Sequence, residues 1–254
     1  MRSDEPIAAV VLDKCSWPEV KAEVERGRDC VVVALGATEQ HGPHLPLATD
    51  ALIGDHLAGL VAERLDAFIA PTVRVGCSSH HLGFPGTLSI SDSTFGAIVA
   101  DLIHSLARGG FRKIVLIPTH GGNFAPLGAA LEQIGTVDGV EIRALTDVRV
   151  LLAIAQLGES DHEVPLGCGG LHAGEWETSM LLAIHPDLVD MTRAEPGYTG
   201  NLQEALATLF HAGVDSISAN GVLGDPAAAS AEHGQRYWDL AVDLVLASVN
   251  GGAS

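Results

Sequence analysis

Residues 34–50, ALGATEQHGPHLPLATD, gather several side chains that can bind metal ions within one short stretch. Glu39 and His41 are two residues apart, so in extended chain their side chains point to the same side. Asp50 lies at the start of an expected helix, where the helix dipole favours a carboxylate. Two carboxylates and an imidazole form a ligand set that suits Zn, Mn or Fe better than Ca. The stretch predicts either half of a metal site or a polar loop before a capped helix.

A second polar segment, IPTHGGN, places His120 at the carboxyl end of an expected strand. Gly121 and Gly122 let the backbone approach a ligand closely, and the helix expected after Asn123 starts with free N–H groups. We expect these three residues to contact a substrate; the alternative is a tight turn with an incidental histidine. Neither a Walker lysine nor a GxGxxG pattern accompanies the segment, which argues against a phosphate-binding loop.

A third segment, GLHAGEWETSML (170–181), places His172, Glu175 and Glu177 at the start of an apolar helix. Carboxylates in the first turn of a helix often do no more than compensate its dipole, so each glutamate has a purely structural alternative. Trp176 lies between them. We expect it either to close over a planar substrate or to pack in the core.

A fourth segment, SSHHLGFPGTLS, contains His80 and His81 before a Phe-Pro-Gly turn. Adjacent side chains usually point apart, so we expect at most one of these two histidines to face a site. We select His81 as the substrate-binding candidate. His44 has no assigned ligand role. His56 and His104 lie inside expected amphipathic helices, where a surface or interface role is expected. The other histidines have no supporting neighbours in the sequence: His162, His185, His211 and His233.

Short β-branched runs alternate with helical patterns along the chain, which is typical of an α/β fold around a mainly parallel sheet. The expected strands are 30–36, 68–76, 113–120 and 141–148, and the expected helices are 49–65, 91–110, 124–135, 175–186 and 230–249. Each polar segment follows a strand, where open α/β sheets bind their ligands. Residues 150–170 are expected to form a long loop that borders the site.

Thr49 and Ser91 are the expected caps of the first two helices, and no linker or internal repeat divides the chain. We therefore expect residues 1–254 to form a single domain.

The composition excludes several classes of protein. Fourteen basic residues against 32 acidic ones give a net charge of −18, and the absence of a basic stripe argues against a nucleic-acid partner. The four cysteines are widely spaced, which argues against a thiolate zinc site and a disulfide framework and fits a reducing compartment. The acidic N-terminal segment 1–12 is unlike a signal peptide, and no apolar run is long enough for a membrane helix. We expect a cytoplasmic protein with no membrane contact.

Taken in order, four motifs resemble the creatininase family over most of residues 31–185. They are E-x-H-G-x-H-L-P-x-x-T-D (39–50), S-x-x-H-x-x-F-P-G-T (78–87), H-G-G-N (120–123) and H-A-G-E-x-E-T-S (172–179). The resemblance implies a three-layer α/β/α sandwich, metal-dependent amide hydrolysis, two divalent metal ions per subunit, and a homohexamer built as a trimer of dimers.

The resemblance also implies roles for single residues. Glu39, His41, Asp50 and His120 fall on metal-ligand positions, with Asp50 as the bridge between two ions. Glu177 is our choice for the remaining carboxylate ligand. His172 falls on a position implicated in proton transfer, with Glu175 as its orienter or an alternate base.

Two departures from the family pattern concern the substrate. Creatinine hydrolases carry a glutamate where this chain has Gly122, and many relatives carry a glutamate where this chain has His80. The H-G-G-N form is more similar to two other branches. One is the deformylase that opens a formamide in archaeal flavin and deazaflavin synthesis, and the other is the peptidase of mycofactocin maturation.

The leading hypothesis is hydrolysis of a non-peptide C–N amide bond, a cyclic amide or a formamide, in a small molecule by a water activated between two Zn, Mn or Fe ions. One alternative keeps the metals but acts as a C–C hydrolase or lyase on a cyclic ketone or polyol. Another is a mycofactocin-type peptidase, and a third is a metal-binding subunit without catalysis.

Overall fold

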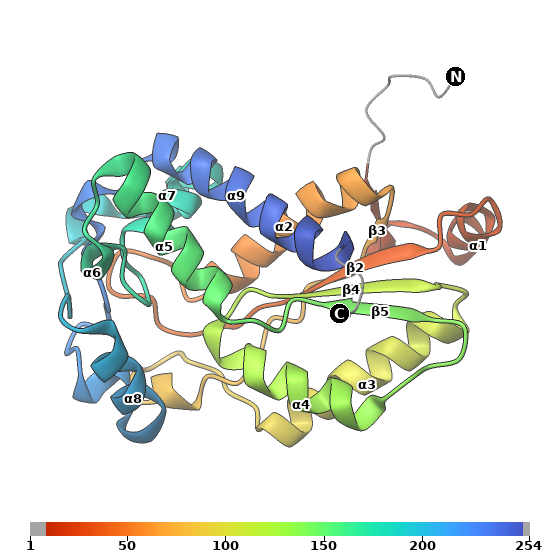
Figure 1. Ribbon diagram of the computed structural model, residues 1–254, viewed down its shortest axis with the longest axis horizontal. Coiled ribbons are helices and arrows are strands. Elements are labelled where there is room, and N and C mark those ends of the chain that lie inside the picture. Colours follow the sequence, from red (N-terminus) through yellow and green to blue (C-terminus); the bar gives the residue numbers. More distant parts are fainter. Residues whose placement is uncertain (1–8, 251–254) are drawn as a thin grey trace.

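The computed structural model describes residues 9–250, and a five-stranded parallel sheet forms its centre (Figure 1). The strand order is β1-β3-β2-β4-β5, with β1 Val10–Val11, β2 Cys30–Leu35, β3 Phe68–Ile69, β4 Lys113–Pro118 and β5 Glu141–Ala144. Most of segment 1–12, whose composition argues against a signal peptide, lies outside the described residues. Among residues 9–250 no helix is long and apolar enough to cross a membrane.

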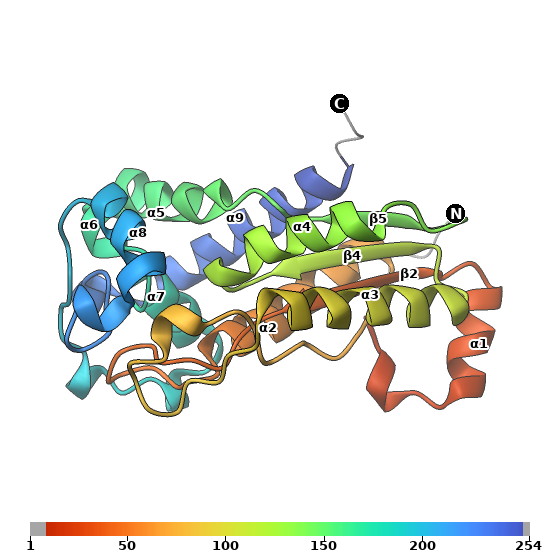
Figure 2. The same ribbon diagram turned by 90° about the horizontal axis from the view of Figure 1, so that it is seen from below.

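Helices cover both faces of the sheet, which confirms the expected three-layer α/β/α sandwich. One face carries α2 (Thr49–Leu65), α5 (Arg149–His162), α7 (Glu175–Ile184) and α9 (Ala231–Asn250). The other carries α1 (Trp17–Glu25), α3 (Asp92–Arg108) and α4 (Phe124–Ile134), of which α3 and α4 lie in front of the sheet in Figure 2.

The two apolar cores follow from the alternation of side chains along β2. Val32 and Ala34 point into the core beneath α2, α7 and α9, whereas Val31 and Val33 point into the core beneath α3. All six residues of β2 are buried, as a strand covered on both faces requires.

The expected strand 68–76 is shorter in the structure, because β3 ends at Ile69. Pro71 has no N–H group to donate to the ladder. The following chain still runs beside β2 as far as Val73, which forms a single bridge to Leu35, and Gly76 then forms a bridge to Ser89.

Of the two expected caps, one is confirmed and one is wrong. The Ser91 hydroxyl accepts a hydrogen bond from the backbone N–H of Thr94 at the start of α3. Helix α2 instead begins after Ala48, and the Thr49 hydroxyl donates to the carbonyl oxygen of Pro46. Thr49 therefore holds the preceding turn and caps no helical N–H.

The expected loop at 150–170 is wrong, because this segment forms most of α5 and the short helix α6 (Leu166–Gly169). The buried Ile154 and Ala155 of α5 join the core, and the polar run 159–161 is its exposed side. Gly158 lies so close to α9 that a Cβ atom there would come within 2.5 Å of the Tyr237 hydroxyl. Gly158 therefore allows close packing of α5 against α9, although the composition of the segment 150–170 indicates a loop.

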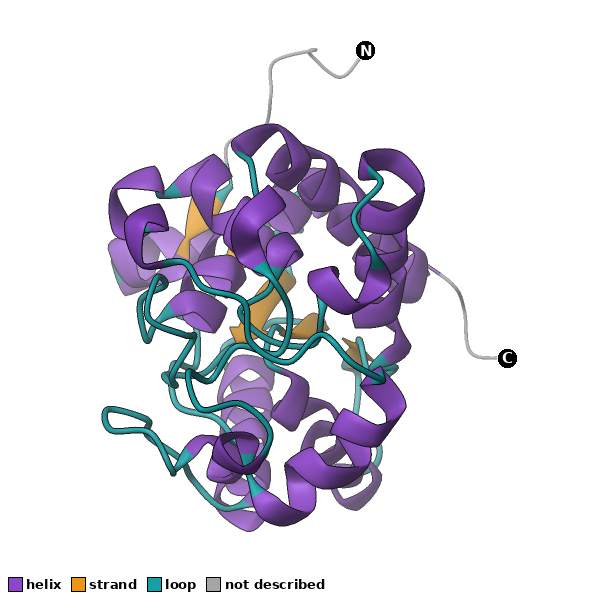
Figure 3. Cartoon of the chain, turned by 90° about the vertical axis from the view of Figure 1, so that its left-hand side faces the viewer, coloured by secondary structure: helices purple, strands orange, loops and turns teal. Residues whose placement is uncertain are grey.

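The carboxyl ends of the strands lead into a group of loops, which faces the viewer in Figure 3. Helices α5, α6 and α7, together with α8 (Leu202–Ala212), gather at this end of the sheet (Figure 1). The polar segments of the sequence therefore meet at one end of the molecule. All four cysteines are free.

Candidate active site

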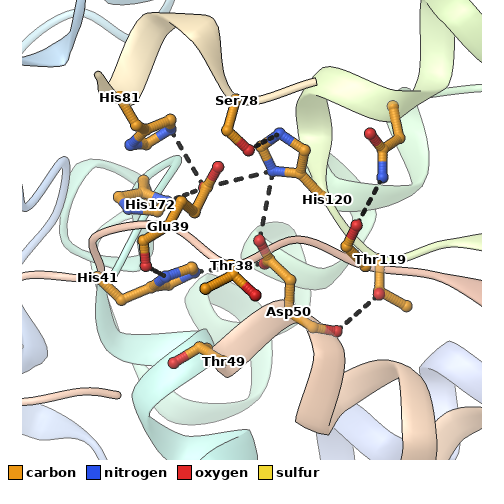
Figure 4. Close-up of polar contacts among 12 residues, drawn as sticks. Thr38, Glu39, His41, Thr49, Asp50, Ser78, His81, Thr119, His120 and His172 are labelled. Atoms are coloured by element: carbon orange, nitrogen blue, oxygen red, sulfur yellow. Dashed lines mark hydrogen bonds and ion pairs between the residues drawn. The ribbon is translucent and has the colours of Figure 1, made fainter. Parts of the chain in front are cut away.

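Four segments that are distant in the sequence bring carboxylates and imidazoles together at the carboxyl end of the sheet (Figure 4). Glu39 and His41 follow β2, Asp50 lies in the first turn of α2, His120 follows β4, and His172 precedes α7. All five side chains are buried. Parallel strands point their carboxyl ends at one edge, so the sheet itself collects these groups.

Glu39 is the centre of this group. Its Oε1 atom lies 3.2 Å from Nε2 of His81 and 3.3 Å from Nδ1 of His120. The same oxygen is 3.7 Å from Nδ1 of His172. One carboxylate oxygen thus faces three imidazoles from three different segments.

Asp50 lies between His41 and His120. Its Oδ1 atom is 3.3 Å from Nε2 of His41, and its Oδ2 atom is 3.4 Å from Nδ1 of His120. The Thr119 hydroxyl donates to the backbone carbonyl of Asp50 over 2.7 Å, which holds the start of α2 against the end of β4. The two oxygens of one carboxylate therefore face two separate imidazoles.

Glu177 adds a second carboxylate group beside His41. The ligand atoms of Glu177, His41 and His172 lie within 4.8 Å of one another, as do those of Glu39, Asp50 and His120. The backbone N–H of Ala173 donates to Glu177. A third set consists of Glu39, His81 and His172, so three overlapping sets of possible metal ligands lie together.

The residues fit a divalent cation, because their buried polar atoms converge and several of them make no hydrogen bond. Both carboxylate oxygens of Glu39, Oδ2 of Asp50 and Nε2 of His41 have no hydrogen-bond partner among the described residues. Buried polar atoms are rarely left unpaired, and divalent cations bound among these atoms would pair them. Oxygen and imidazole ligands suit Zn, Mn or Fe.

The pKa values indicate that this group attracts positive charge. Burial alone would lower the pKa of His41, but the Asp50 carboxylate raises it to about 9. Burial would also lower the pKa of His120, but the carboxylates of Glu39 and Asp50 raise it well above the ordinary value. Burial raises the pKa of Glu177 to about 7. A metal ion would replace these protons and stabilise the buried carboxylates.

Three of the imidazoles present a lone pair to the group. His120 Nε2 lies 3.2 Å from the Cys77 carbonyl oxygen, and His172 Nε2 lies 2.6 Å from that of Gln40. His41 Nδ1 lies 3.2 Å from the backbone carbonyl oxygen of Glu39. A carbonyl only accepts, so the neutral ring carries its proton on that side and its free nitrogen faces inward. Histidines that bind metals are oriented in this way.

His81 presents a proton instead, because Gln40 fixes its tautomer. The Gln40 Oε1 atom accepts from the backbone N–H of Gly42, so its Nε2 group is the donor to the Gly221 carbonyl and to His81 Nδ1. His81 Nδ1 therefore accepts, and its Nε2 carries the proton. Burial and the neighbouring His172 lower the pKa of His81, so the ring is neutral. Gln40 was not among the expected site residues, because its role depends on contacts with Gly42 and Gly221 in the folded chain.

The expectation that at most one of His80 and His81 faces the site is wrong. Both are buried, both line the same cavity, and their ring centroids are 4.4 Å apart. Residues Ser79–His81 form a 3-10 turn, in which neighbouring side chains do not alternate as they do in a strand.

The structure also explains the departure at Gly122. A Cβ atom there would lie 2.3 Å from the Cys77 carbonyl oxygen and 2.9 Å from Cε1 of His80. A glutamate at this position would need the chain at Cys77 and the His80 ring to move. The two departures from the family pattern are therefore neighbours in space, with His80 beside the space that a side chain at 122 would enter.

Glu175 does not face the cavity, which removes the support for its expected catalytic role. Its carboxylate is fully buried and accepts hydrogen bonds from Tyr237 at 2.6 Å, His233 at 2.7 Å and Ser179 at 2.8 Å. Residues two apart on a helix differ by about 200° in direction. Glu177 therefore points into the site when Glu175 points away. His233 was not expected to have a polar partner, and it meets Glu175 only in the folded chain.

Asn123 does not line the cavity either, so its expected contact with substrate is not supported. Its amide donates to the carbonyl oxygens of Leu35 and Gly36 over 3.0 Å and accepts from the N–H of Cys77. Asn123 thus joins the end of β2 to the His80 turn. Gly121, Gly122, Trp176 and His81 do line the cavity.

A cavity of about 500 Å³ opens above the metal-binding residues. Its outer wall comes from α5 and its N-terminal flank, with Val148, Leu151 and Leu152, and from α8, with Leu206, Leu209 and Phe210. Leu151 and Leu152, which lie within the segment 150–170 expected to border the site, line the cavity, but α8 was not expected there. The exposure of Leu206 and Phe210 on α8 is a property of the folded chain that the sequence does not show.

Comparisons with known proteins agree on one family. The family model described as Creatinine amidohydrolase matches residues 13–249. A mycofactocin precursor peptide peptidase of Mycolicibacterium smegmatis is 36% identical over 82% of this chain and 79% of its own length. A creatinine amidohydrolase of Pseudomonas putida is 33% identical over 73% and 75% of the two chains. A 3-dehydro-scyllo-inosose hydrolase of Thermotoga maritima is 28% identical over 85% and 75%.

Solved structures give the same result. A creatininase described as a manganese form superposes with a TM-score of 0.78 at 29% identity, covering 96% of this chain and 98% of the other. A mutant creatininase described as a Zn-Zn type superposes with a TM-score of 0.77 at 28% identity, with the same coverage. With its sequence match from residue 13 to residue 249 and its three-layer fold, the chain belongs to the creatininase family of hydrolases.

Proposed function

We propose that the protein is a divalent-metal-dependent hydrolase that cleaves an amide C–N bond in a small molecule, with a cyclic amide or a formamide as the leading substrate. The observation that carries this proposal is the set of buried carboxylates and imidazoles that converge at the floor of a cavity, where several of their polar atoms make no hydrogen bond. The relatives named above as amidohydrolase and peptidase support the choice of an amide.

We assign the ligands to two metal ions. Glu39 and His120 would hold one ion, His41 and Glu177 the other, and Asp50 would bridge them. The creatininase structures described as manganese and Zn-Zn forms support a pair of divalent ions. When bound, such ions lower the pKa of a water molecule and polarise a carbonyl oxygen.

His81 and His172 act at the two ends of the amide bond. His81 directs its Nε2–H group to the carbonyl oxygen, where it stabilises the negative charge that develops there. His172 presents a free Nδ1 atom, because its other nitrogen donates to the Gln40 carbonyl. That nitrogen accepts a proton and delivers it to the leaving nitrogen. Backbone at Gly121 and Gly122 and the Trp176 ring complete the substrate contacts.

The test is an activity screen of the metal-reconstituted protein over formamides, cyclic ureas, lactams and short peptides, with chelator controls. We expect release of an amine or ammonia that stops when the metal is removed. The metal content is measured first. Fewer than one tightly bound transition ion per chain would contradict the proposal.

Peptide hydrolysis is the second candidate, favoured by the 36% identity to a peptidase and by a cavity larger than a small cyclic amide needs. The peptide arm of the screen separates the two. A C–C bond hydrolase is the third, in view of the inosose hydrolase relative. In that case product analysis would find turnover of a cyclic ketone without release of an amine.

A further inference from the structure

The outer part of the cavity has an apolar lining that the metal-binding residues do not explain. We call this lining the apolar chamber and define it as Val148, Leu151, Leu152, Leu206, Leu209 and Phe210. The first three residues belong to α5 and its N-terminal flank and the others to α8, and both helices lie at the carboxyl end of the sheet (Figure 1). The chamber leads directly to the catalytic floor, since the Phe210 ring centroid is 4.9 Å from that of His80.

Several chamber residues are exposed in the described chain. Phe210 is 61% exposed, Val148 48% and Leu206 37%. Exposed apolar side chains that line one concave surface indicate a binding site, whereas single ones are ordinary.

The chamber also lacks any group that could pair with a charged substituent. Among the described residues that line the cavity none is a lysine or arginine, and the carboxylates lie on the floor, at Glu39, Asp50 and Glu177. A charged group placed in the chamber would lose its water without gaining a partner, which is costly.

We propose that the substrate carries an uncharged aromatic or branched aliphatic group next to the scissile amide bond, and that α5 and α8 enclose this group. The inference rests on the proposed function, because it names the substrate class of the same site. A cavity of about 500 Å³ has room for such a group beside the amide.

The test is the affinity of three hydroxamates, which bind metal ions and differ only in the group that would enter the chamber. Acetohydroxamate, phenylacetohydroxamate and 4-carboxyphenylacetohydroxamate are titrated into the metal-loaded protein by calorimetry. We expect the phenyl compound to bind about 10- to 100-fold more tightly than the methyl compound, because burying an aromatic ring is favourable. The carboxylate should remove most of this gain.

The variant Phe210→Ala should reduce the ratio of the affinity for the phenyl compound to that for acetohydroxamate. Phe210 is exposed, so its removal leaves no hole in the core. Leu206→Asn tests a second position on α8. The matched control is Trp17→Ala, an exposed aromatic residue on α1 at the other end of the molecule.

Equal affinity for the methyl and phenyl compounds would overturn the inference and leave the proposed function standing. So would an unchanged preference in both α8 variants, or an equal loss of preference in the Trp17 control. If none of the hydroxamates binds to the metal-treated protein, the proposed metal site itself is contradicted, and this inference fails with it.

Discussion

Gln40 lies beside the active site and determines which hydrogen-bonding role His81 has. Both ends of its amide are in use, with the oxygen bonded to the N–H of Gly42 and the nitrogen bonded to the Gly221 carbonyl and to His81. This arrangement leaves the proton of His81 on Nε2, the nitrogen that lies 3.2 Å from Oε1 of Glu39. His81 thus differs from His41, His120 and His172, each of which presents a lone pair.

The variant Gln40→Glu tests this role. A carboxylate only accepts, so His81 Nδ1 would become the donor and Nε2 would lose its proton. We expect kcat to fall about 10²- to 10³-fold, as for the loss of one donor to a developing oxyanion, with a smaller change in KM. Nitrogen NMR of the His81 ring reports the tautomer directly. An unchanged tautomer with reduced kcat would contradict the explanation.

The variant His172→Ala tests the proton transfer. We expect kcat to fall about 10²- to 10⁴-fold with metal content intact, because the ring moves a proton and is not needed to hold the ions. Metal analysis alongside kinetics separates this role from that of a ligand, which its position also permits. His104→Ala, at an exposed position on α3, is the matched control. Full activity in the His172 variant would exclude the role.

At the scale of elements, the N-terminus of α7 depends on its contact with α9. Glu175 on α7 is the acceptor for Tyr237 and His233 on α9, and it is completely buried. The rings of His233 and His162 are stacked, with centroids 3.8 Å apart, which brings the end of α5 into the same cluster. One carboxylate thus links three helices behind the segment that carries His172 and Glu177.

Replacing this carboxylate should reduce stability. In Glu175→Gln one acceptor oxygen becomes a donor, so a buried hydroxyl or imidazole loses its partner. We expect a loss of about 1–3 kcal/mol in the free energy of unfolding, measured by denaturant titration. Glu232→Gln, on the exposed side of α9, should change stability by less than about 0.5 kcal/mol. Equal effects of the two substitutions would show that the buried cluster contributes nothing.

At the scale of the whole molecule, the homohexamer expected from the family resemblance remains a prediction. The described chain exposes several large apolar side chains outside the cavity, among them Leu88 at 52% and Leu188 at 42%. We expect light scattering to give six times the chain mass of 26.3 kDa, and the dimer as the intermediate on dilution. A monomer at micromolar concentration would contradict this expectation.

Much of the architecture could be predicted from local patterns. The β-branched runs that form β2 and β4, the Ser91 cap and the amphipathic α3 depend on a few neighbouring residues, and the structure has them where the sequence indicates. The segments that meet at the site were also predictable, because a parallel sheet brings the carboxyl ends of its strands to one edge. The family resemblance rests on these same segments.

The tertiary structure alone decided which side chains face the site. The patterns around Glu175 and Glu177 are equally compatible with catalysis, and only the packing of α7 against α9 turned one of them inward. A 3-10 turn brought both His80 and His81 to the cavity. The Gln40 amide, which is hydrogen-bonded to Gly42 and Gly221, determined which ring nitrogen of His81 carries the proton. Local spacing was enough to predict most of the helices and strands and the kinds of group that follow them, although α5, α6 and the end of β3 were missed. The direction of each group depends on contacts between residues far apart in the chain, which exist only once the chain has folded.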